Sequence, residues 1–131
     1  MAAELTGRCL CGAIRYRATA APLWASHCHC ESCRRATGAP LTTYAGFSAA
    51  AFAWTAGEPV RFASSEGVVR TFCGCCGTSL TYQGDRWPGE VHVLAATLDR
   101  PEAVTPRGEA FAGERLPWLH LAPPPAVAAE S

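Results

Sequence analysis

The sequence contains no lysine, so all eleven of its basic residues are arginines. Eleven acidic residues balance them and give a formal net charge of zero at neutral pH. Domains that bind nucleic acids usually carry an excess of positive charge that holds the phosphates. The composition therefore argues against a nucleic-acid partner.

Long apolar stretches are also missing from the sequence. Every apolar run is interrupted well before the roughly 20 residues that a membrane span needs. Residues 1–4 lead into a polar segment rather than into the apolar core of a signal peptide. We therefore expect a cytoplasmic protein with no membrane partner. Because thiols stay reduced in the cytoplasm, metal binding explains the eight cysteines better than disulfides do.

No long amphipathic helix is found along the chain, which argues against an α/β fold. Instead, short apolar and aromatic segments alternate with turns that contain glycine, proline, serine or aspartate. We expect strands at residues 13–18, 23–28, 41–45, 51–54, 60–63, 68–73, 79–82 and 90–98. Short strands at this spacing predict an all-β domain of antiparallel strands.

Helix is expected at one place only. Ser32 would cap one or two turns that include Cys33 and Thr37 and end at Gly38. The 131 residues suit a single domain, with neither an internal repeat nor a linker, and we assign it to residues 1–122. Residues 123–131 start with three prolines followed by small residues, which predicts a disordered tail.

The cysteines fall into three groups, and their number allows two tetrahedral zinc sites. The groups are Cys9 with Cys11, then Cys28, Cys30 and Cys33, then Cys73, Cys75 and Cys76. Residues two apart in a strand point to the same face, so a Cys-x-Cys pair can present two sulfurs to one ion. The middle group can supply three ligands by itself, whereas the outer groups each supply a pair and need one another.

The outer groups predict a closed, structural four-thiolate zinc site formed by Cys9, Cys11, Cys73 and Cys76. Cys73 and Cys76 have the two-residue gap of a zinc knuckle, with glycines that permit a tight turn. That gap favours Cys76 over Cys75, and Cys75 remains the alternative ligand.

The middle group predicts a second zinc ion, held by Cys28, Cys30 and Cys33 with its fourth position open. Three thiolates make the ion a poor activator of water, and soft sulfur ligands favour another thiol as the guest. Arg34 and Arg35 are candidates for offsetting the excess charge or binding a substrate carboxylate. His27 and His29 are alternatives for a fourth ligand or a proton carrier, and at most one of them should face the ion.

Three sequence segments carry a resemblance to a known family. GRCLCGAIRY at residues 7–16, CHCESCRR at 28–35 and FCGCCGTSL at 72–80 are similar to motifs of the glutathione-dependent formaldehyde-activating enzymes, a family that includes centromere-protein-V-like proteins. The resemblance runs from about residue 5 to about residue 100. It implies a β-tent zinc fold with a structural zinc at Cys9, Cys11, Cys73 and Cys76 and a second zinc at Cys28, Cys30 and Cys33.

The activity that the resemblance implies joins formaldehyde to the thiol of glutathione and forms S-hydroxymethylglutathione, which is carbon–sulfur lyase chemistry in reverse. Zinc and glutathione are then the expected cofactor and thiol substrate, and a small aldehyde is the second substrate. The alternative is a non-catalytic zinc module that binds glutathione or another protein. No residue in the sequence is singled out as the catalytic acid or base.

Overall fold

The computed structural model describes residues 4–122, and the predicted tail at 123–131 lies outside the described residues. This part of the chain contains ten strands: β1 (Leu5–Arg8), β2 (Arg15–Ala18), β3 (Trp24–Cys28), β4 (Thr42–Ser48), β5 (Phe52–Ala56), β6 (Val60–Ser65), β7 (Val68–Phe72), β8 (Ser79–Gly84), β9 (Glu90–Leu94) and β10 (Glu109–Ala110). The described residues also form one α-helix, α1 (Glu31–Thr37), and four short 3-10 turns, η1 (Ala49–Ala51), η2 (Ala95–Thr97), η3 (Pro101–Ala103) and η4 (Ala112–Glu114). The predicted all-β class with a single short helix is confirmed.

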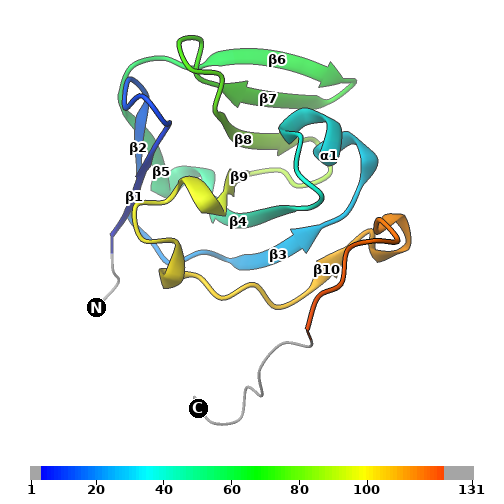
Figure 1. The fold of residues 1–131 in the computed structure, drawn as a ribbon. Helices are drawn as coiled ribbons and strands as arrows, with labels where there is room; N and C mark the ends of the chain where they lie inside the picture. Colours follow the sequence, from blue (N-terminus) through cyan, green and yellow to red (C-terminus); the bar gives the residue numbers. More distant parts are fainter. Residues whose placement is uncertain (1–3, 123–131) are drawn as a thin grey trace, which may run out of the picture.

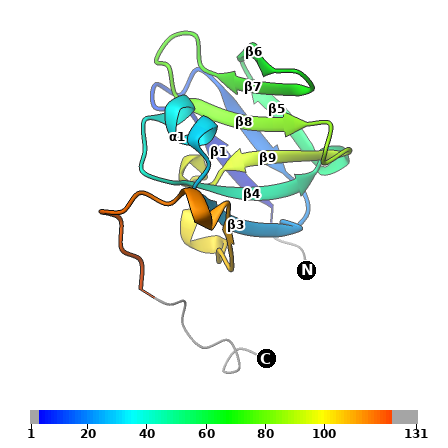
Figure 2. The ribbon, with the colours of Figure 1, turned by 90° about the vertical axis from the view of Figure 1, so that its right-hand side faces the viewer.

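The strands form two sheets that are not closed into a barrel. The small sheet has the order β1-β2-β5, and the large sheet has the order β10-β3-β4-β9-β8-β7-β6. Neighbouring strands are antiparallel except β10, which pairs in parallel with β3. The small sheet lies along one side of the large sheet and α1 lies on the opposite side (Figure 1). Figure 2 looks onto that opposite side, with α1 in front of the large sheet.

The two faces of the large sheet have different roles. Ala45, Phe47, Val91 and Val93 are buried in the main core together with Tyr16 and other residues of the small sheet. Side chains that alternate with these along β4 and β9 point to the other face. The small sheet therefore covers one face, while the opposite face remains available for a site.

Several local predictions differ from the structure. Strand β1 is absent from the predicted strands, because its two inward positions are Leu5 and Gly7, and a glycine gives no apolar signal. Strand β9 ends at Leu94 and continues as the turn η2 instead of reaching residue 98. Cys30, rather than Ser32, caps α1, because its sulfur accepts a hydrogen bond from the backbone N–H of Cys33 at 3.3 Å.

Gly46 leaves room for the Trp24 ring on the open face of the large sheet. Its neighbour in β3 is Trp24, and a Cβ atom at position 46 would overlap the indole ring. We therefore expect Gly46→Ala to displace Trp24 and to lower the free energy of unfolding by about 1–3 kcal/mol, as overpacking does elsewhere. Urea denaturation measures this change. Gly113→Ala is the matched control, since a Cβ there meets no atom within 4 Å, and equal stabilities of the two variants would contradict the expectation.

Candidate functional site

Four cysteines from distant parts of the chain meet at one end of the molecule. Cys9 and Cys11 follow β1, and Cys73 and Cys76 follow β7. Their sulfur atoms all lie within 4.8 Å of one another, with 3.7 Å from Cys9 to Cys11 and 3.8 Å from Cys11 to Cys73. Zinc–sulfur bonds of about 2.3 Å in a tetrahedron place the sulfurs about 3.8 Å apart. The cluster therefore has the dimensions of a four-thiolate zinc site.

Backbone N–H groups point at the sulfurs of this four-thiol cluster. Ile14 donates to Cys9 at 3.3 Å, and Cys75 and Cys76 donate to Cys73 at 3.3 and 3.4 Å. Such bonds stabilise thiolates and orient them toward a metal. The Cys75 side chain is exposed and lies outside the cluster, so the structure brings Cys76, and not Cys75, to the other three sulfurs.

A second cluster contains the three cysteines of the middle group. Cys28 ends β3, Cys30 caps α1 and Cys33 lies in its first turn. The three sulfurs lie within 4.8 Å of one another, and 3.8 Å separates Cys28 from Cys33. Neither His27 nor His29 is part of this three-thiol cluster. All eight cysteines are free, and the two clusters could hold metal ions, which is consistent with zinc.

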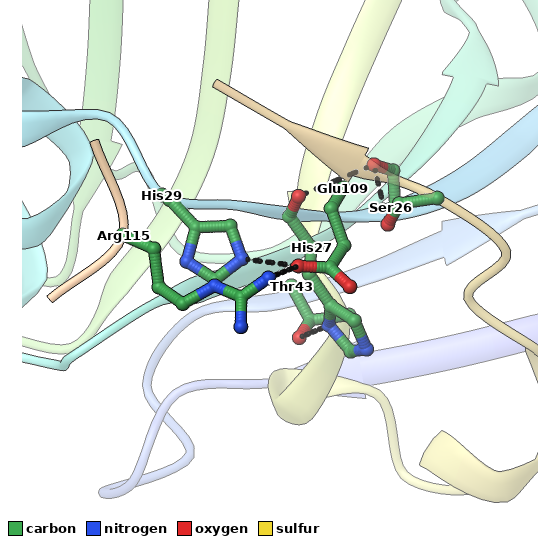
Figure 3. A network of polar contacts seen from close by, with 7 residues as sticks. Ser26, His27, His29, Thr43, Glu109 and Arg115 are labelled. Atoms are coloured by element: carbon green, nitrogen blue, oxygen red, sulfur yellow. Dashed lines mark hydrogen bonds and ion pairs between the residues drawn. The ribbon is translucent and has the colours of Figure 1, made fainter. Parts of the chain in front are cut away.

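The two histidines beside Cys28 have other partners (Figure 3). His27 Nδ1 lies 2.8 Å from the hydroxyl of Thr43. His29 is fully buried, and its Nε2 lies 2.9 Å from Oε1 of Glu109, which also accepts a hydrogen bond from Arg115 at 3.4 Å. The contact of His29 with Glu109 therefore holds β10 against the end of β3, next to the three-thiol cluster, whereas the contact of His27 with Thr43 joins β3 to β4.

Cys33 has two polar neighbours besides the other cysteines. The Tyr44 hydroxyl donates to its sulfur at 3.3 Å, and both terminal nitrogens of Arg70 lie 3.8 Å from it. Hydrogen bonds from Cys28, Tyr44 and Cys30, together with the charge of Arg70, lower the pKa of the Cys33 thiol to about 5. This environment therefore favours the thiolate form that binds metals.

The three-thiol cluster opens into a cavity of about 570 Å³. This volume lies within the range of roughly 300–1,000 Å³ that is usual for small-molecule sites. Besides the three cysteines, its lining includes Trp24, Ser26, Tyr44, Arg70, Tyr82, Arg86, Trp87, His92, Ala110, Phe111 and Glu114. By contrast, none of the four-thiol cysteines lines this cavity, so only the three-thiol cluster adjoins it.

One row of residues across five strands forms a wall of the cavity. The strand register pairs Arg70 with Tyr82, Tyr82 with His92, His92 with Gly46, and Gly46 with Trp24. Paired residues lie side by side on one face of a sheet. The absence of a side chain at Gly46 leaves room for the Trp24 ring. This ring meets the His92 ring edge-on, with 4.5 Å between the two ring centroids.

His92 is nearly buried at the centre of this row. Its Nε2 lies 2.8 Å from Oε1 of Glu90, and the same oxygen accepts a hydrogen bond from the Trp24 indole N–H at 3.1 Å. Burial lowers the pKa of His92 below its usual range, although the hydrogen bond to Glu90 offsets part of this effect. The imidazole is therefore mainly neutral at pH 7.

The predicted substrate-binding residues Arg34 and Arg35 do not line this cavity. The Arg35 guanidinium pairs with Glu31 at 2.8 Å on the exposed side of α1. The Nε atom of Arg34 is buried and has no hydrogen-bond partner within residues 4–122. Their predicted role in substrate binding stays a prediction, whereas the arginines that do line the cavity are Arg70 and Arg86.

Sequence reasoning did not identify Arg70, His92 or their aromatic neighbours as site residues. A signal was present, because Arg70 and His92 are ionisable residues in the interior of the mainly apolar strand sequences VVRTF and EVHVL. A polar side chain in such a strand needs a partner or a cavity. The sequence does not indicate which strands bring these residues together.

The fold and the site define an all-β domain with two cysteine clusters that can hold metals, one of which adjoins a cavity. Residues 4–114 match the family described as glutathione-dependent formaldehyde-activating enzyme. Since this match spans most of the sequence, the chain belongs to that family, as its three cysteine motifs predicted. No helix within residues 4–122 is long and apolar enough to cross a membrane.

Two further similarities are informative. The chain is 35% identical over 80 residues to a protein of Schizosaccharomyces pombe that is named an uncharacterized lyase, and the match covers 60% of this chain and 57% of that relative. The chain thus spans little more than half the length of this curated relative. A crystal structure of a Rhodobacter sphaeroides protein, a structural genomics target, superposes with a TM-score of 0.66 at 23% identity. It covers 80% of this chain and 99% of the other and supports the fold alone.

Proposed function

We propose that the chain is a zinc-dependent enzyme of the carbon–sulfur lyase type that acts on the adduct of glutathione with a small aldehyde, such as formaldehyde. Family membership and the lyase named among its relatives support this class of reaction. The cavity beside the three-thiol cluster supports a small-molecule substrate. We place the activity in the cytoplasm and in one domain comprising residues 1–122.

The two cysteine clusters suit zinc in different ways. Cys9, Cys11, Cys73 and Cys76 would complete a tetrahedron and hold a structural ion. Cys28, Cys30 and Cys33 would hold a second ion with one position free, and this position adjoins the cavity. When bound there, zinc supplies positive charge that favours the deprotonated form of an entering thiol.

The observation that carries the proposal is the opening of the three-thiol cluster into a cavity that two arginines line. Three thiolates and one zinc ion leave one negative charge, which the neighbouring Arg70 offsets. Arg70 also lies 5.0 Å from the centre of the Tyr82 ring, and Arg86 lies 5.1 Å from that of Trp87. Stacking of this kind holds guanidinium groups in place, where they can attract the carboxylates of a peptide thiol.

The reaction needs few chemical groups. The thiol sulfur forms a bond to the carbonyl carbon, the π bond of the carbonyl breaks, and the thiol proton ends on the oxygen. The reverse sequence releases thiol and aldehyde. The residues of the chain must therefore orient the thiol, exclude water from the aldehyde and transfer one proton. The aromatic side chains around the cavity provide the apolar surroundings for the first two tasks.

Calorimetry with glutathione, first alone and then with formaldehyde, tests the proposal. We expect glutathione to bind the zinc-loaded protein, and Arg70→Gln to weaken binding by about tenfold or more, because a hydrogen bond to a charged group contributes about 1.5–3 kcal/mol. Arg61→Gln is the matched control, since Arg61 is exposed on β6 and lies outside this cavity. Absence of glutathione binding would contradict the proposal. Binding without turnover of the adduct would favour a non-catalytic glutathione-binding module.

A further inference from the structure

His92 and Glu90 form a hydrogen-bonded pair beside a cavity, whereas an ordinary core histidine is surrounded by packed side chains. His92 lines the cavity that also contains the three-thiol cluster. The pair lies on the face of the large sheet that the small sheet does not cover, and His92 itself stands in the row that contains Tyr82 and Arg70. It is therefore the histidine that shares the cavity with Cys28, Cys30 and Cys33.

The contacts of the pair determine which nitrogen is available. Glu90 can only accept a hydrogen bond when it is ionised, so the imidazole carries its proton on Nε2. The Trp24 indole donates to the same carboxylate oxygen and fixes its position. Nδ1 of His92 makes no hydrogen bond within residues 4–122, so this nitrogen can accept one from a molecule that enters the cavity beside His92.

Aromatic rings fix the orientation of the imidazole. Tyr82 stacks on it at a centroid distance of 5.5 Å, Trp24 contacts it edge-on, and Trp87 lies 5.4 Å away. A ring held by packing and by a carboxylate has the preorganisation that proton transfer needs.

We propose that His92 is the catalytic acid–base of the thiol–aldehyde reaction and that Glu90 is its positioning residue. This inference rests on the proposed function. Nδ1 of His92 accepts the proton of the thiol as the carbon–sulfur bond forms, and the resulting imidazolium returns that proton to the former carbonyl oxygen. Glu90 stabilises the imidazolium between the two transfers. No proton is gained or lost overall, and no other reactant is needed.

The charges around His92 agree with this role. The titratable side chains next to it are Glu90 on β9, Tyr82 on β8 and Tyr44 on β4, and Cys33 on α1 acts on it through its charge. Burial keeps the pKa of His92 below its ordinary value, so the ring is neutral and able to accept a proton at pH 7. The partial rise that Glu90 causes makes the imidazolium accessible during the reaction.

The test is the rate of adduct formation from glutathione and formaldehyde by the zinc-loaded protein and its variants. We expect His92→Ala to lower the catalysed rate by about 100-fold, which is the lower end of the usual contribution of general acid–base catalysis. Added imidazole should restore part of that rate in His92→Ala and should not accelerate the wild type beyond its effect on the uncatalysed reaction. His120→Ala, at an exposed histidine, is the matched control and should retain the wild-type rate.

A second variant separates catalysis from folding. His92→Gln keeps an amide that can donate to Glu90 but cannot carry a proton, so we expect it to fold, to bind glutathione and to be as slow as His92→Ala. A wild-type rate in either variant would overturn the catalytic role of His92 and would leave the proposed function unaffected. A loss of rate that imidazole does not restore would also overturn it, since packing would then explain the loss. If the wild-type protein itself gives no acceleration, both the proposed function and this inference are wrong.

Discussion

Cys76→Ser is expected to remove zinc from the four-thiol cluster and to abolish stable folding, whereas Cys75→Ser should leave metal content and stability unchanged. Structural zinc in small domains contributes about 10–16 kcal/mol of apparent binding free energy. Whole domains are stable by only about 5–15 kcal/mol. Because Cys76 would complete a tetrahedron that ties the segment after β1 to the segment after β7, we expect its loss to remove a link between the two sheets.

Metal analysis and thermal unfolding of the two serine variants provide the measurement. The substitutions are chemically identical and lie one residue apart, so the only relevant difference is membership of the cluster. We expect two zinc ions per chain in Cys75→Ser and a large fall in melting temperature, or insoluble protein, for Cys76→Ser. The opposite order of stabilities would show that Cys75 is the ligand and would overturn the assignment of Cys76.

Cys30→Ser is expected to abolish acceleration of adduct formation while the fold remains intact. A serine at position 30 can still accept the backbone N–H of Cys33, so α1 keeps its N-terminal cap. The proposed second zinc, however, would lose one of its three protein ligands. Charge stabilisation by a metal is worth several kcal/mol, and each 1.4 kcal/mol is about tenfold in rate, so a loss of at least about 100-fold is expected.

This second prediction separates the two clusters. Zinc content should fall from two ions to one per chain, and the urea midpoint should stay close to that of the wild type. Cys75→Ser is again the control for replacing a thiol with a hydroxyl. If Cys30→Ser lacks the second zinc and still accelerates the reaction, the three-thiol cluster is not the site of catalysis.

Cysteine spacing predicted how the thiols group in space, because the placement of two sulfurs on one ion depends only on residues that are close together in the sequence. Cys9 with Cys11 and Cys73 with Cys76 each fit the geometry of two sulfurs on one ion, whatever the rest of the fold does. The structure brings these four thiols together as predicted, and their role as zinc ligands stays a prediction. The all-β class followed in the same way from short apolar segments between turns.

The rest of the site depends on strand register, which local patterns do not determine. Arg70, Tyr82 and His92 come from three strands and lie in one row only because β7, β8 and β9 pair as they do. Arg34 and Arg35 were singled out for their position next to Cys33. In the helix, however, Arg35 turns toward Glu31 on the exposed side, and Arg70 from a distant strand contacts the Cys33 sulfur instead.

The central claim is that this family member accelerates the reversible addition of glutathione to formaldehyde at the three-thiol cluster. Exchange NMR on an equilibrium mixture of glutathione and ¹³C-labelled formaldehyde measures the rate of interconversion directly. We predict that the zinc-loaded protein raises this rate in proportion to its concentration. An exchange rate that stays at the uncatalysed value at every protein concentration would contradict the claim.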